Sequence, residues 1–93
     1  MANENHLKIL KKGVEEWNRW RKINNSITPD LNGADLFATT MTGANLTRAN
    51  LENTNLSVSN LLGANLTSAN LLWANLNKCN LKIDRDFLFF GSG

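Results

Sequence analysis

The sequence predicts a solenoid, in which short repeats coil and stack on one another, and three features of residues 29–83 lead to this prediction. A large aliphatic residue returns at every fifth position. The residue before it is almost always Asn or Asp, and the residue before that one is small. We expect the aliphatic positions to form one core ladder: Leu31, Leu36, Met41, Leu46, Leu51, Leu56, Leu61, Leu66, Leu71, Leu76 and Leu81.

A period of five residues fits neither of the ordinary secondary structures. On an α-helix a five-residue step turns by roughly 140°, so the leucines would spiral around the cylinder. On a flat strand side chains alternate, so successive leucines would point to opposite faces. A chain that makes a short extended piece and a corner in every five residues can turn every leucine inward, provided that its coils stack on one another.

The repeated unit A-(N/D)-L-x-x resembles the pentapeptide-repeat proteins. Eleven consecutive units, somewhat over half of the chain, carry the resemblance. Because four pentapeptides make one square coil in that family, the resemblance implies a right-handed quadrilateral β-helix of just under three coils, formed by residues 29–83. With twenty residues per coil, Asn50 would stack on Asn70 and Asn55 on Asn75, and we expect ladders of side-chain amides there.

Residues 1–28 differ from the repeats in period and composition, and they are expected to cap the open end of the first coil. Apolar residues at helical spacing predict one amphipathic helix from Asn5 to about Asn24, with Asn3 or Asn5 as its N-cap. Gly13 weakens this helix by about 1 kcal/mol relative to alanine, so we expect tertiary packing to hold it. Its expected apolar face is Leu7, Leu10, Val14, Trp17 and Trp20.

This N-terminal segment has a second interpretation. The stretch V-E-E-W-N-R-W-R, from Val14 to Arg21, resembles leaders that precede bacterial, particularly cyanobacterial, pentapeptide repeats. A basic amphipathic helix could instead bind membrane surfaces or calmodulin-like partners. Because Trp17 and Trp20 lie next to a core that needs cover, we favour the cap.

Residues 84–93 break the repeat and form a short apolar tail with too few apolar residues to span a membrane. This tail could fold back over the last coil, or two molecules could stack there, as family members do that dimerise through their C-terminal coils. A third possibility is that the chain is the N-terminal piece of a longer protein. We favour a homodimer, with this candidate interface: Leu72, Trp73, Ile83, Phe87, Leu88, Phe89 and Phe90.

The residues give no indication of a catalytic, cofactor-binding or metal site. His6 is the only histidine and is expected to be solvated at the helix start, with no Cys or carboxylate cluster at metal-ligand spacing beside it. Asp30 and Asp35 belong to the repeat column, and the lone Cys79 occupies the small inward-facing column, where we expect it to be core. We therefore expect a protein that is not an enzyme and needs no cofactor.

The formal charge bears on the DNA-mimic function of the family, in which a rod-shaped member imitates DNA and modulates a type II topoisomerase. Residues 29–83 carry three acidic and three basic residues, so they lack the strong negative potential that mimics phosphates, and the repeat body is short. Direct nucleic-acid binding is also disfavoured, because the excess positive charge lies on the N-terminal segment, whose aromatic residues are needed for burial.

The sequence thus predicts a non-catalytic structural or protein-interaction module that self-associates through its C-terminal end. A topoisomerase-modulating DNA mimic is the first alternative, and a module that docks on a membrane through Phe87–Phe90 is the second. Since no apolar run approaches 20 residues and no signal-peptide pattern is visible, we expect the cytoplasm as its compartment. The residues name no particular protein partner.

Overall fold

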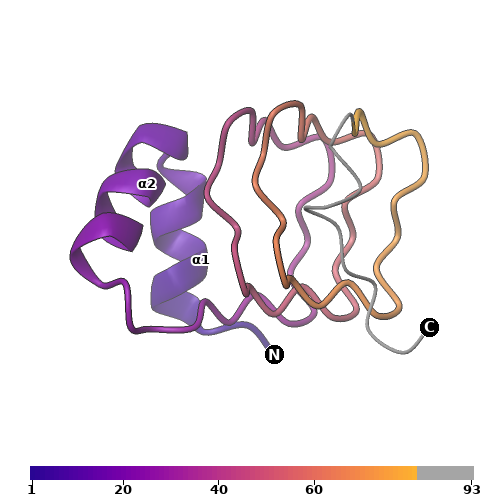
Figure 1. The fold of residues 1–93 in the computed structure, drawn as a ribbon. Coiled ribbons are helices and arrows are strands. Elements are labelled where there is room, and N and C mark those ends of the chain that lie inside the picture. The colour runs from indigo at the N-terminus through magenta and orange to yellow at the C-terminus, as the bar shows by residue number, and fades with distance from the viewer. Residues whose placement is uncertain (82–93) are drawn as a thin grey trace.

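A computed structural model describes residues 1–81, which form a helical cap and a coiled repeat body (Figure 1). Helix α1 spans Glu4–Lys11 and helix α2 spans Val14–Ile23, and both lie against one end of the repeat body. From residue 29 onward the chain coils away from these helices. We use "cap" below for residues 1–28.

The cap contains two helices in place of the single helix expected from Asn5 to about Asn24. Gly13 has a φ of 123°, which is far from helical and which residues with a side chain rarely adopt, so the chain turns there. Asn3 is the N-cap of α1, and its Oδ1 accepts hydrogen bonds from the N–H groups of Asn5 at 2.9 Å and His6 at 3.1 Å. The turn allows α1 and α2 to pack side by side across the end of the solenoid.

The repeat body is a β-solenoid with a register of twenty residues. Seven isolated parallel β-bridges each join two residues that are twenty positions apart, beginning with Asp30 and Asn50. The Asn50 N–H donates to the Pro29 carbonyl at 2.8 Å, and the Asn50 carbonyl accepts from the Leu31 N–H at 2.8 Å. Each bridging residue directly precedes an aliphatic residue, so every coil holds four of them.

A tight turn follows each aliphatic residue from Leu31 to Leu76 and keeps the paired segments short. The Leu56 carbonyl accepts a hydrogen bond from the Ser59 N–H at 3.1 Å, and Val58 between them has a φ of 61°. This hydrogen bond and a positive φ at the third residue are the pattern of a type II turn. The same position has a positive φ in each unit from Gly33 to Lys78, and only three of these residues are glycine. Among the described residues the pairing therefore stays at single bridges and does not extend into longer strands.

The aliphatic side chains of the core ladder fill the interior of the solenoid. The nine from Leu31 to Leu71 are at most 3% exposed, whereas Leu76 and Leu81 in the last described coil are half-buried. Thr54 stands where most units have alanine, and its buried hydroxyl donates to the carbonyl of residue 51 at 2.8 Å, which satisfies it without water. The core therefore runs continuously through the stack, and its side chains are less completely buried in the last described coil.

The ladders expected between stacked asparagine amides are not found: in residues 1–81 no hydrogen bond joins two such side chains. Instead the Oδ1 of each asparagine of this column from Asn45 to Asn75 accepts from the backbone two residues later, as Asn55 does from the Ser57 N–H at 3.1 Å. Across coils, Asn55 Nδ2 lies 3.5 Å from an Asp35 carboxylate oxygen, and Asn70 Nδ2 donates to Glu52 at 3.2 Å. The asparagine column thus stabilises the turn of its own unit.

Leu56→Ala should lower the free energy of unfolding by about 2–5 kcal/mol, because this side chain is fully buried in a narrow interior that cannot readily collapse around a cavity. Leu76→Ala is the matched control and should cost less, since Leu76 is only half-buried. Urea unfolding followed by circular dichroism measures both. Equal losses for the two variants would contradict the difference in burial.

Candidate functional site

The first coil has no preceding coil with which to pair, so the backbone groups on its outer edge need other partners. Inside the stack, the Asn65 N–H donates to the Ala44 carbonyl of the preceding coil at 2.9 Å. Asn45 holds the same position one coil earlier, and its N–H donates to Asn18 Oδ1 of α2 at 2.8 Å. A side chain of the cap therefore takes the place of the missing coil.

Two further side chains of α2 hold the same edge. The Asn45 carbonyl accepts from Trp17 Nε1 at 2.8 Å and from Arg21 Nη1 at 2.9 Å. Arg21 Nη2 also donates to the Thr47 carbonyl at 3.0 Å and the Thr47 hydroxyl at 3.1 Å. Arg21 is only 3% exposed, and burial lowers the pKa of its guanidinium, as does repulsion from Arg48. Helix α2 is thus joined to one side of the coil by hydrogen bonds to its backbone.

Helix α1 and its N-cap hold a second side of the first coil, at Asp30. The Asn3 N–H donates to the Asp30 carbonyl at 3.0 Å, and the Asp30 N–H donates to His6 Nδ1 at 3.0 Å. His6 is 9% exposed and its ring centroid lies 4.8 Å from that of Trp20, so the expectation of a solvated histidine is wrong. His6 lies four residues before Leu10, which places both on one face of a helix, and this spacing could have indicated that His6 is buried.

The structure places the five expected apolar cap residues at different depths. Leu10 and Trp17 are buried, whereas Leu7, Val14 and Trp20 are half-buried. All five join the apolar cluster that continues into the core ladder, and the ladder residues of the first coil are fully buried. Cap and solenoid therefore share one core.

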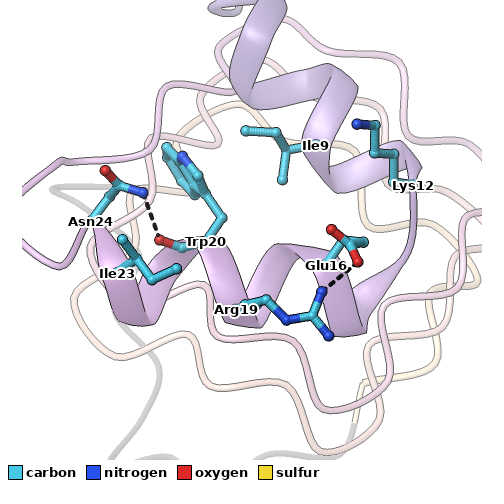
Figure 2. A pocket seen from close by; sticks show the side chains of 7 residues that line it. All are labelled: Ile9, Lys12, Glu16, Arg19, Trp20, Ile23 and Asn24. Carbon is cyan, nitrogen blue, oxygen red and sulfur yellow. Dashed lines mark hydrogen bonds and ion pairs between the residues drawn. The ribbon is translucent and has the colours of Figure 1, made fainter.

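A small pocket opens on the outer side of the cap, between α1 and α2 (Figure 2). The sequence pattern did not indicate this pocket, because it predicts one continuous helix and the pocket lies between two helices. Its volume is about 210 Å³. The residues that line it are Ile9, Lys12, Glu16, Arg19, Trp20, Ile23 and Asn24.

The C-terminal candidate interface is described only in part. Leu72 is half-buried and Trp73 is 76% exposed on the last described coil. Ile83 and the tail residues Phe87, Leu88, Phe89 and Phe90 lie outside the described residues. Of the seven expected interface residues, the structure therefore describes only Leu72 and Trp73, which are adjacent in the sequence.

The structure also places the histidine, cysteine and carboxylate side chains of residues 1–81. Residues 1–81 contain no group of three or more His, Cys, Asp or Glu side chains that could hold a metal ion. Cys79 is a free, half-buried thiol whose Sγ lies 3.5 Å from the Ser59 hydroxyl oxygen. Neither helix of this part of the chain has the length and apolarity required to cross a membrane.

Acidification below about pH 6.5 should destabilise the cap. Because His6 Nδ1 accepts the Asp30 N–H, the fold favours the neutral imidazole; burial lowers the pKa of His6, and the Asp30 charge partly opposes this. Because the folded pKa lies below the unfolded value of 6.5, the contribution of His6 to stability is complete above pH 6.5 and is lost progressively as the pH falls from there through the folded pKa.

Urea unfolding of the wild-type chain and His6→Asn between pH 8 and pH 5 measures this effect. The asparagine keeps an acceptor at the same place but does not titrate, so its profile should be flatter over this range. Parallel profiles for the two chains would show that His6 is not the titrating group.

Comparison with known families supports the resemblance seen in the repeats. The family model described as "Pentapeptide repeats (8 copies)" matches residues 30–58 and 44–82, two overlapping ranges that together cover more than half of the chain. The matched ranges include all seven bridges with the twenty-residue register. Searches of curated proteins and of solved structures gave no significant match. The family match and the coiled backbone agree, and the chain belongs to the pentapeptide-repeat family.

Proposed function

We propose that this protein is a non-catalytic structural or protein-interaction module that forms a homodimer through the C-terminal end of its solenoid. The observation that supports this is the difference between the two ends. The cap covers the first coil, whose ladder residues are fully buried. In the last described coil Leu76 and Leu81 are only half-buried, and Trp73 is 76% exposed. An incompletely covered apolar end of a stack favours association with a second one.

The proposed contact follows from the shape of the coil. Four bridges per coil support a quadrilateral cross-section, and the family supports a right-handed β-helix. Two such ends can meet around a two-fold axis, so that the same surface is buried on both copies and the assembly closes at two. The apolar sequence of Phe87–Phe90 would add area to this contact.

A DNA-mimic role toward a type II topoisomerase is the weaker proposal. Residues 29–83 carry equal numbers of acidic and basic residues, and the cap carries six basic against three acidic residues. A phosphate mimic needs the opposite charge distribution. The proposed module therefore acts through apolar and shape complementarity.

Light scattering over a concentration series should give a dimeric mass for the full chain and a monomer or aggregate for a chain that ends at Asp86. Phe37→Ser is the matched control: it removes an apolar side chain that is 56% exposed on the first coil, far from the proposed contact, and it should stay dimeric. A monomeric full chain would refute the dimer. A truncated chain that stays dimeric would place the contact outside the tail.

A further inference from the structure

The pocket on the outer side of the cap has an apolar floor that is fixed before anything binds. The Trp20 ring lies against His6 and Trp17, with centroid separations of 4.8 Å and 5.2 Å. The Trp20 carbonyl accepts hydrogen bonds from the Asn24 N–H at 2.9 Å and from Asn24 Nδ2 at 3.0 Å. Ile9 is half-buried and packs against the core. A ligand would therefore meet a preformed surface, which lowers the entropic cost of binding.

The size and shape of the pocket suit one large side chain. Its volume of about 210 Å³ is below the roughly 300–1,000 Å³ of typical small-molecule sites. The two helices form its walls, and Ile23 at its edge is 74% exposed (Figure 2). A single exposed isoleucine needs no explanation, but this one borders a pocket whose floor is formed by Trp20 and Ile9, so it can add apolar contact to a bound side chain.

The charges around the pocket favour an acidic ligand. Glu16 is paired with Arg19, whereas Lys12 has no ion pair within residues 1–81 (Figure 2). The cap as a whole has three more basic than acidic residues, while residues 29–81 carry three acidic and two basic residues. A carboxylate beside the apolar group of a ligand would therefore meet complementary charge at Lys12.

We propose that this pocket binds a segment of a partner protein in which one large apolar side chain is flanked by Asp or Glu. The apolar side chain packs on Trp20 between Ile9 and Ile23, and a carboxylate binds Lys12. A lipid surface fits less well, because Trp20 and Ile9 line a depression and do not project from the cap. This inference rests on the proposed role as a protein-interaction module, but it uses the opposite end of the molecule from the proposed dimer contact.

Titration of the full chain with short blocked peptides, followed by amide and indole NMR signals, tests the proposal. The probes are Gly-Asp-Phe-Asp-Gly and the versions with Leu, Met or Trp in place of Phe. At least one should bind saturably and shift the signals of Trp20 and Ile23. Replacing Phe by Ala, or both Asp by Lys, should weaken binding by about fivefold or more, since both the apolar and the charged contact are needed.

Substitutions in the chain give matched comparisons. Ile23→Ser and Lys12→Glu should each weaken binding by about fivefold or more. Ile27→Ser and Lys11→Glu change the same chemistry at exposed residues that do not line the pocket, and they should leave the dissociation constant unchanged. All four residues are exposed, so the variants should fold, which circular dichroism checks.

Three outcomes would overturn the proposal. These are no saturable shift with any of the four acidic probes, equal effects of pocket and control substitutions, and equal binding of the acidic and basic peptides. Flotation with phosphatidylserine vesicles that Ile23→Ser abolishes, without peptide binding, would assign the surface to lipid. Normal peptide binding by a chain that is monomeric in light scattering would leave this inference standing and refute only the proposed dimer.

Discussion

Backbone hydrogen bonds between residues twenty positions apart are the constraint on which the rest of this molecule depends. They set the register in which the leucines stack, and they leave a row of unpaired groups wherever the stack begins. At the first coil, Asn18 and His6 supply acceptors, and Asn3, Trp17 and Arg21 supply donors, where a preceding coil would otherwise pair. The cap therefore covers the apolar end of the core and also supplies the hydrogen-bond partners that the backbone of a preceding coil would provide.

The period of five predicted the buried ladder, because one pattern repeated eleven times admits few arrangements that bury every leucine. The register of twenty residues was predicted by the resemblance to the pentapeptide-repeat family, and the bridges have that register. The break of the cap helix at Gly13 was not predictable in the same way, since a cost of about 1 kcal/mol is compatible with a continuous helix. Packing against the end of the solenoid favours two short helices over one rod. The asparagine side chains had two possible sets of partners, the amides of the neighbouring coil and the backbone of their own unit. Their Oδ1 atoms bond the backbone N–H two residues later.

The pocket was not visible in the sequence because it exists only where α1 and α2 lie side by side. On one continuous helix, Ile9 and Ile23 would be 14 residues apart and could not line the same cavity. The turn at Gly13 thus gives the cap a second, outward-facing surface in addition to the one that covers the core. The two ends of the molecule differ in chemistry: the cap is basic and has a pocket with an apolar floor, and the last described coil exposes Trp73.

Hydrogen exchange of the Asn45 amide in the native wild-type chain and in Asn18→Ala would test most directly whether cap side chains replace a missing coil. Asn18 Oδ1 accepts this N–H at 2.8 Å, so its removal should speed Asn45 exchange by about tenfold. The Asn65 amide, which donates to the Ala44 carbonyl at 2.9 Å, should keep its protection. Unchanged exchange at Asn45 in the variant would contradict this role of the cap.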